Sequence, residues 1–238
     1  MSVKAVLFDL DGTLLPMDQE KFVKDYFGRL AAFLAPHGYE PKALIDTVWQ
    51  GTAAMVKNDG SLTNEGRFWQ VFNSRLGDGG EERAALFDSF YAEEFDKVSA
   101  SCGYDGEAPR LTRELRSRGY RLILATNPIF PSAATYRRIR WAGLNPDDFE
   151  LITTYENSRY TKPNLDYYRE ILASAGLSAE ECIMVGNDVG EDMVAERLGV
   201  RTYLVTRDLI NRAGEDISRY SRGSLLDILP LLDASETK

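Results

Sequence analysis

Short apolar runs alternate with stretches of helical composition over most of this chain. Runs that are apolar on both faces, as expected of parallel strands covered by helices on either side, occur at 3–8, 122–125, 151–153, 182–185 and 202–205. Helix-like stretches lie between or after them, at 108–118, 132–142, 165–175, 191–198 and 224–232. The alternation predicts right-handed strand–helix–strand units and an α/β fold with a doubly wound parallel sheet.

The segment from 17 to 105 interrupts this alternation. It has no comparable strand-like run, and its helix-like stretches lie at 19–35, 41–57, 64–76 and 81–98. We interpret it as an all-helical domain inserted after the first strand, so that residues 1–16 and 106–238 form the α/β core and residues 17–105 form a cap. The alternative is that these helices pack directly on the sheet as part of one core.

Polar side chains follow the carboxyl ends of the predicted strands. Asp9 and Asp11 come directly after the first strand, and side chains two residues apart point to the same side of a strand. The other polar groups in such positions are Thr126, Asn127, Lys162, Asn187, Asp188 and Asp192. Open α/β sheets bind ligands at this edge, so we expect one shared crevice. Taken singly, each has a structural explanation, such as a helix cap, a turn or a surface position.

Composition removes several other chemistries. The 28 Lys and Arg against 37 Asp and Glu give a net charge of −9, which disfavours a general nucleic-acid binder. The one histidine, His37, lies in a predicted turn, and the two cysteines are Cys102 and Cys182, so zinc sites and histidine-dependent nucleophiles are not expected. Carboxylates, hydroxyls, lysine and a metal that prefers oxygen ligands remain.

The chain shows no targeting pattern. No 18 apolar residues run together, the amino-terminal residues do not resemble a signal peptide, and two distant cysteines do not indicate a disulfide framework. The sequence therefore predicts a soluble cytoplasmic protein without a membrane partner.

As a set, the strand-end residues resemble the four motifs of the haloacid dehalogenase-like (HAD) phosphohydrolase superfamily. Asp9-Leu10-Asp11-Gly12-Thr13 matches the first motif fully, and Thr126, Lys162 and the segment 186–192 follow in order at suitable intervals. The helical insertion resembles that superfamily's C1-type cap, which lies between the first and second motifs. The resemblance implies a Rossmann-like core and Mg²⁺-dependent hydrolysis of a small phosphorylated metabolite, a phosphomonoester.

The resemblance also implies catalytic roles. Asp9 is expected to be the nucleophile that forms an aspartyl-phosphate, and Asp11 the general acid and base. Lys162 is expected to neutralise charge, while Thr126 and Asn127 hydrogen-bond phosphate oxygens. The family's dehalogenases lack an aspartate at the position of Asp11, which favours phosphate esters over haloacids.

For the metal, the resemblance implies a shell of the Asp9 carboxylate, the backbone carbonyl of Asp11 and Asp188. Asn187 stands where the family often has aspartate, and we assign the ligand role to Asp188 because its spacing to Asp192 keeps the family's usual interval. Asp192, or less favourably Glu191, is expected to bind metal waters or to orient Lys162, with Asn187 beside them.

A second departure from the motifs concerns Pro128, which follows Asn127 and removes a backbone donor near the phosphate.

The insertion is expected to select the substrate by closing over the crevice, with hinges near 15–16 and 103–106. We expect its aromatic residues Trp49, Phe68, Trp69 and Phe72 to form mainly bundle core, with substrate stacking as the alternative.

Two other functions fit the same residues: a phosphomutase or phosphotransferase, and a non-catalytic phospho-aspartate switch, against which Asp11 argues. Phosphoglycolate, nucleotide monophosphates, sugar phosphates and pyrophosphate all remain open as substrates, as does the oligomeric state.

Overall fold

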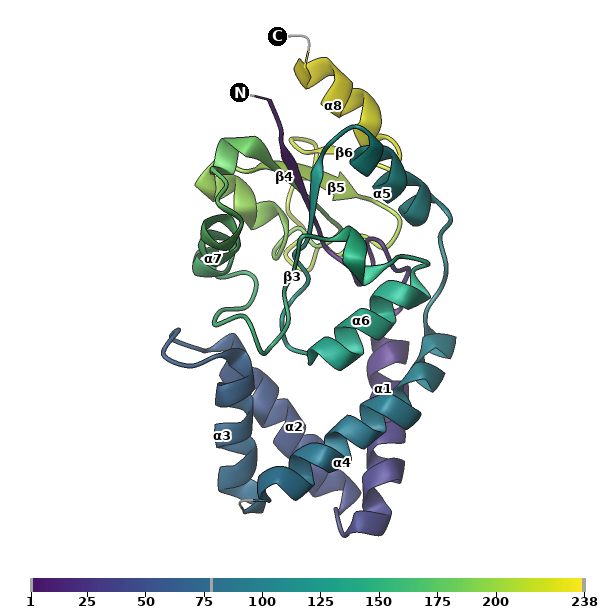
Figure 1. Cartoon of the computed structure of the whole chain (residues 1–238), viewed down its shortest axis with the longest axis vertical. Coiled ribbons are helices and arrows are strands. Elements are labelled where there is room, and N and C mark those ends of the chain that lie inside the picture. The colour runs from purple at the N-terminus through teal and green to yellow at the C-terminus, as the bar shows by residue number, and fades with distance from the viewer. Residues whose placement is uncertain (1, 78, 237–238) are drawn as a thin grey trace.

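The computed structural model describes residues 2–77 and 79–236, and its centre is a six-stranded sheet (Figure 1). All strand pairs are parallel, in the order β3-β2-β1-β4-β5-β6. The strands are β1 (Ala5–Phe8), β2 (Arg121–Leu124), β3 (Leu151–Ile152), β4 (Cys182–Gly186), β5 (Arg201–Val205) and β6 (Ser221–Gly223). The predicted doubly wound α/β fold is confirmed, and β6 is the strand that the apolar pattern did not predict.

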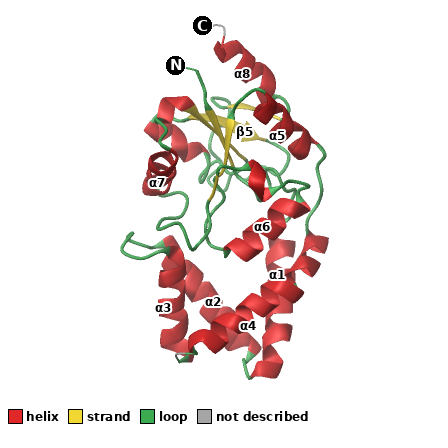
Figure 2. Cartoon of the chain, in the orientation of Figure 1, coloured by secondary structure: helices red, strands yellow, loops and turns green. Residues whose placement is uncertain are grey.

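Helices cover both faces of this sheet (Figure 2). Those of the α/β part are α5 (Glu107–Ser117), α6 (Ser132–Trp141), α7 (Leu165–Ala175) and α8 (Ile228–Glu236), with short 3₁₀ turns η3 (Pro146–Asp148), η4 (Ala179–Glu181) and η5 (Met193–Leu198). The helix expected at 191–198 is thus a 3₁₀ turn that begins later, because Asp192 is held by side-chain contacts described below.

Alternation along β1 explains the two layers. Val6 and Phe8 pack in one hydrophobic cluster with Leu111 of α5 and Ile228 of α8. Ala5 and Leu7 belong to a second cluster, which contains Tyr167 and Ile171 of α7. Because neighbouring residues of a strand point to opposite faces, a strand that is apolar throughout is buried on both sides.

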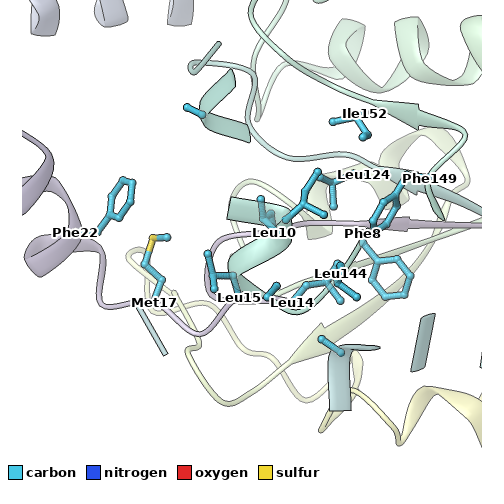
Figure 3. Packing of buried hydrophobic residues seen from close by; sticks show 14 of the residues in the cluster. Phe8, Leu10, Leu14, Leu15, Met17, Phe22, Leu124, Leu144, Phe149 and Ile152 are labelled. Atoms are coloured by element: carbon cyan, nitrogen blue, oxygen red, sulfur yellow. The ribbon is translucent and has the colours of Figure 1, made fainter. Parts of the chain in front are cut away.

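The segment that follows β1 is also packed into the core. Leu10, Leu14 and Leu15 are fully buried, and Figure 3 shows them beside Phe8 and Leu124. The same cluster continues through Met17 to Phe22 of the first helix (Figure 3). The backbone around Asp9 and Asp11 is therefore held by apolar packing on both sides of the acidic pair.

The helices between β1 and α5 are α1 (Gln19–Leu34), α2 (Pro41–Val56), α3 (Asn64–Leu76) and α4 (Gly80–Glu93), with 3₁₀ turns η1 (Ala35–His37) and η2 (Phe95–Ser101). The side chains of Asp18, Glu40 and Thr63 cap the first three helices. Figure 1 shows α2, α3 and α4 at the end of the molecule opposite the two termini. The helical insertion follows the expectation, while its treatment as a separate cap with boundaries at 16/17 and 105/106 stays a prediction.

The chain enters and leaves this helical segment at adjacent points. The Gly103 N–H donates to the Pro16 carbonyl at 2.8 Å, and Met17 pairs with Cys102 in an antiparallel bridge. The Gly103–Pro16 hydrogen bond and the neighbouring Met17–Cys102 bridge thus lie at the hinges predicted near 15–16 and 103–106.

A third connection is made by Asn64, the first residue of α3, which is fully buried. Its Nδ2 donates to the carbonyls of Pro128 (3.1 Å) and Tyr160 (3.2 Å), and its backbone N–H donates to Ser158 (2.8 Å). Asn64 thereby ties the helical segment to two loops of the α/β part.

The aromatic residues of the insertion divide into two groups. Phe68 and Phe72 are buried as bundle core, as expected. Trp49 is an exception to the bundle core: the residue is 48% exposed, and together with the half-buried Trp69 it lines a cavity between the helices. His37 is exposed. Across residues 2–77 and 79–236, no helix combines the length and apolar character needed to cross a membrane.

Candidate functional site

A cavity of about 200 Å³ opens at the carboxyl edge of the sheet. Of the predicted site residues it is lined by Asp9, Asp11, Thr126, Asn127, Asn187, Asp188, Glu191 and Asp192. Lys162 reaches Asp9 from beneath, on the loop that precedes α7. The structure therefore brings together residues that lie far apart in the sequence, at the edge where parallel strands end.

Asp9 is fixed on three sides. Its backbone N–H donates to the Val185 carbonyl at 2.9 Å, which continues the β1–β4 pairing by one residue. One carboxylate oxygen lies 2.8 Å from Lys162 Nζ, and the other accepts a hydrogen bond from the Thr13 hydroxyl at 3.1 Å. Asp9 is 8% exposed, so a reactive carboxylate is held in place at the floor of the cavity.

Lys162 lies between two carboxylates. Its ammonium contacts Asp9 at 2.8 Å and Asp192 at 2.6 Å, and all three side chains are almost completely buried. Burial by itself lowers the pKa of Lys162, but the attraction of Asp192 and Asp9 outweighs it and raises that pKa well above its usual range. The lysine therefore stays charged and offsets part of the negative charge of the cavity.

Asp192 lines the cavity but is almost fully buried, and both of its carboxylate oxygens contact other residues of the site. One of its oxygens holds Lys162, and the other accepts the backbone N–H of Asp188 at 3.0 Å. Burial raises the pKa of Asp192. A Cβ on Gly186 would lie 2.1 Å from the Asp192 carboxylate, so only glycine allows this approach. Asp192 thus contacts Lys162 directly, and its expected role in orienting that lysine stays a prediction.

The two oxygens of the Asp188 carboxylate have different partners. One oxygen accepts the backbone N–H groups of Gly190 (2.8 Å) and Glu191 (3.0 Å). The other lies 2.8 Å from Arg212, whose side chain is 65% exposed. An ion pair with so exposed a partner is weak, so this oxygen can exchange Arg212 for another cation.

Asn187 and Glu191 make contacts within the protein. The Asn187 amide donates to the Asp208 carbonyl at 2.5 Å and accepts from the Thr13 hydroxyl at 3.0 Å, which joins the loops that follow β1 and β4. Glu191 accepts a hydrogen bond from Asn127 at 3.1 Å, and burial raises its pKa. Both residues line the cavity, but their hydrogen bonds shape its wall.

Thr126 is buried where β2 ends. Its backbone carbonyl accepts from the hydroxyls of Thr153 (2.7 Å) and Tyr167 (2.8 Å), so the main chain at this point is fixed from β3 and α7. No side-chain hydrogen bond of Thr126 is formed within the described part of the chain, which leaves its hydroxyl available to a ligand.

Asp11 is paired with a residue that sequence reasoning missed. Arg138 of α6 contacts one Asp11 oxygen, its side chain is 1% exposed, and its guanidinium lies 4.6 Å from the centre of the Phe130 ring. Burial raises the pKa of Asp11, although the Arg138 charge acts in the opposite direction. The sequence gives only one weak indication that Arg138 is buried, which is its position on the same stripe of the helix as Thr135, Ile139 and Ala142.

The donor set of the cavity suits a hard divalent cation. Within residues 2–77 and 79–236, no three His, Cys, Asp or Glu side chains lie together as a ready metal cluster. The predicted shell needs only two carboxylates, Asp9 and Asp188, with the Asp11 carbonyl, waters and a phosphate oxygen. Two buried oxygens at this cavity, Asp11 Oδ1 and Asn127 Oδ1, have no hydrogen-bond partner in the described structure, as expected where a polar ligand completes the site.

Residues 3–199 match the family described as hydrolase, haloacid dehalogenase-like hydrolase. The chain is 24% identical to the pyrophosphatase PpaX of Halalkalibacterium halodurans over 234 residues, covering 96% of this chain and 98% of that protein. It is also 24% identical to the glyceraldehyde 3-phosphate phosphatase of Methanopyrus kandleri over 233 residues, covering 97% and 89%.

Among solved structures, a HAD family enzyme of Bacteroides thetaiotaomicron, in complex with magnesium and inorganic phosphate, has a TM-score of 0.53. It is 18% identical, and the match covers 91% of this chain and 98% of that one. This likeness supports the fold.

Proposed function

Because this chain belongs to the haloacid dehalogenase-like hydrolase family, we propose that it is a phosphatase that cleaves a small phosphomonoester through an aspartyl-phosphate on Asp9, with Mg²⁺ as its cofactor. The observation that carries the proposal is the buried Lys162 ammonium, 2.8 Å from the Asp9 carboxylate in a cavity that also presents Asp11. The protein is proposed to act in the cytoplasm on a small phosphorylated metabolite.

The first half-reaction transfers the phosphoryl group to the protein. An Asp9 oxygen attacks phosphorus, the bond from phosphorus to the ester oxygen breaks, and Asp11 gives its proton to the leaving oxygen. A raised pKa favours the protonated form of Asp11 that this step needs. Lys162 attracts the transferring group, and Thr126 and Asn127 are placed to hydrogen-bond its oxygens.

The second half-reaction releases phosphate. The Asp11 carboxylate takes a proton from water as the water oxygen attacks phosphorus, and the bond between phosphorus and the Asp9 oxygen breaks. Asp9 returns as a carboxylate and Asp11 as an acid, so protons balance over the cycle. Asp192 keeps Lys162 beside Asp9 through both steps.

The Asp9 carboxylate, the Asp11 carbonyl and Asp188 would hold Mg²⁺, whose positive charge draws the substrate phosphate among these carboxylates. The all-oxygen donor set supports this assignment, as does the Asp188 oxygen that pairs with the exposed Arg212. The complex of the Bacteroides enzyme with magnesium and inorganic phosphate supports it by analogy.

The helical segment 17–105 is proposed to act as the cap that covers the substrate. Phe22 and Val23 of α1 already line the catalytic cavity, so the segment contributes one wall of it. Its movement about the connections at Pro16 and Gly103 would admit substrate and release products.

The decisive test is hydrolysis of p-nitrophenyl phosphate by wild type and Asp9→Asn, with Mg²⁺ or EDTA. We expect Asp9→Asn to lose activity by about 10³-fold or more, because an amide cannot form the acyl phosphate. EDTA is expected to abolish wild-type activity and added Mg²⁺ to restore it. Activity that survives the substitution sinks the proposed mechanism.

Product analysis and mass spectrometry separate the other functions of the same residues. Free phosphate is expected, whereas an isomerised sugar phosphate would indicate a mutase. A phosphorylated Asp9 that persists without turnover would indicate a switch module, for which the acid Asp11 has no use.

A further inference from the structure

A second cavity, of about 180 Å³, lies between the helical segment and loop residues 129–131 and 155 of the α/β part, and it adjoins the catalytic one. Val23, Ile129 and Phe130 line both cavities, so these residues form the partition between them. We call this space the cap cavity. Its walls are mainly aromatic and include Tyr26, Phe27, Trp49, Trp69, Phe87 and Tyr155. A substrate whose phosphate lies against Asp9 would extend its leaving group past the partition into this space.

The charged groups of the cap cavity are all negative. Glu65 of α3 and Asp88 of α4 line it, and its lining includes no Lys, Arg or His. Neither carboxylate forms an ion pair or a side-chain hydrogen bond with the described part of the chain. One further carboxylate, Glu156, adds to the negative potential: burial is the largest cause that raises the pKa of Glu65, and Glu156 and Asp88 raise it further.

Such a lining discriminates among leaving groups. A second phosphate or a carboxylate would be repelled by Glu65 and Asp88. A neutral apolar group would fill the aromatic walls but leave both carboxylates unpaired, and one of them, Glu65, is partly buried. A substituted ammonium satisfies both features, because aromatic faces attract a cation and carboxylates neutralise it.

We propose that the cap cavity binds a substituted ammonium group, so that the substrate is the phosphate monoester of an amino alcohol. The inference rests on the proposed function, since it takes the catalytic cavity as the place of the phosphate. It also separates this chain from the pyrophosphatase PpaX, whose named substrate has an anionic leaving group.

The test uses two esters that differ in one atom. Phosphocholine carries a quaternary nitrogen where 3,3-dimethylbutyl phosphate carries carbon, so their shapes match and their charges differ. We expect kcat/KM for phosphocholine to exceed that for the neutral ester by about tenfold or more, in line with the strength of cation recognition by aromatic and acidic groups. Equal values, or a preference for the neutral ester, overturn the inference.

Variants show whether the named carboxylates cause the preference. Glu65→Gln and Asp88→Asn should each reduce the ratio of the two kcat/KM values, and the double variant should bring it within about threefold of unity. The ratio cancels any common effect on catalysis. Glu93→Gln is the matched control, because Glu93 is an exposed carboxylate of the same helix α4 and lines neither cavity. A ratio that stays at the wild-type value in the double variant also overturns the inference.

Binding can be measured without phosphatase chemistry. Trp49 and Trp69 line the cap cavity, so choline should change tryptophan fluorescence saturably, while 3,3-dimethylbutan-1-ol should bind at least several-fold more weakly. If the protein hydrolyses p-nitrophenyl phosphate but does not distinguish the charged from the neutral compound in either the kinetic or the binding assay, this inference is overturned and the proposed function stands. Choline binding in a protein that hydrolyses no ester overturns the proposed function instead.

Discussion

Arg138 controls the surroundings of the proposed acid. Its side chain is 1% exposed and pairs with Asp11, which is itself 23% exposed. An arginine in this place opposes the protonation of Asp11, and burial outweighs it. The arginine therefore positions the carboxyl group at the edge of the cavity and limits how far its pKa rises.

Removing Arg138 should cost stability through Asp11. We expect Arg138→Met to lower the free energy of unfolding by about 2–4 kcal/mol, because it leaves a partly buried carboxylate without its partner. In a double-mutant cycle measured by denaturant unfolding, the variant that carries both Arg138→Met and Asp11→Asn should be more stable than Arg138→Met alone by at least about 1 kcal/mol. Strictly additive losses would show that the two side chains are not coupled.

A substitution at Gly186 tests whether the close packing of Asp192 holds Lys162 in place. Gly186→Ala would place a Cβ 2.1 Å from the Asp192 carboxylate, which cannot move without releasing Lys162 or the Asp188 backbone. We expect a loss of about 2–3 kcal/mol in denaturant unfolding and at least a tenfold fall in kcat. Gly28→Ala is the control: nothing lies within 4 Å of that added Cβ in α1, so stability should stay or rise by up to about 1 kcal/mol.

Among the elements, α3 is anchored by its first residue. Asn64 is fully buried and donates to carbonyls of Pro128 and Tyr160, while its own oxygen accepts from Asn58 at 2.9 Å. These contacts oppose separation of the helices from the loops beside the catalytic cavity.

Asn64→Ala should therefore destabilise the chain by about 2–4 kcal/mol, because buried carbonyls lose their donors. Hydrogen exchange should also quicken around 58–66 and 155–160. Asn145→Ala, which removes an exposed side-chain cap from η3, should cost about 1 kcal/mol or less. Equal losses in the two variants would contradict the anchoring role of Asn64.

Elements with a strong local pattern could be predicted from the sequence. The runs that became β1, β2, β4 and β5 are apolar on both faces, and α3 and α7 have the predicted limits. β6 could not be predicted, because Ser221–Gly223 is a short, largely exposed polar segment that becomes a strand only by pairing with β5.

The candidate site likewise contains residues that the sequence predicts and contacts that it does not. Asp9 and Asp11 could be located because a strand places them together, and Lys162 and Asp188 because their order along the chain resembles known motifs. The contact of Arg138 with Asp11 joins residues 127 positions apart, and the exposure of Trp49 depends on how four helices pack. Local patterns carry no information on either.

For the whole molecule, negative charge gathers at one place. Asp9, Asp11, Asp188 and Glu191 share the catalytic cavity, in a chain of net charge −9. Lys162, Arg138 and Arg212 offset part of that charge. A cation bound there would stabilise the folded state, because the unfolded chain does not assemble these ligands.

Mg²⁺ should therefore raise the thermal midpoint of unfolding. At about 100 times its Kd the stabilisation is about 2.7 kcal/mol, which corresponds to a rise of several degrees for a chain of this size. Differential scanning fluorimetry should show a smaller rise in Asp188→Asn. An unchanged rise in that variant would place the metal elsewhere.

The hydrogen bond between Gly103 and Pro16 places the two ends of the helical segment side by side, so the segment can be replaced as a unit. Because the polypeptide departs and returns at one spot, a different helical segment could be spliced in there without lengthening any strand or moving Asp9. The new segment would have to match the contacts that join the helices to the α/β part, which include those of Asn64, the ion pair of Asp96 with Arg137, and the partition between the two cavities. Natural or laboratory evolution can thus alter what is bound while inheriting the catalytic machinery intact.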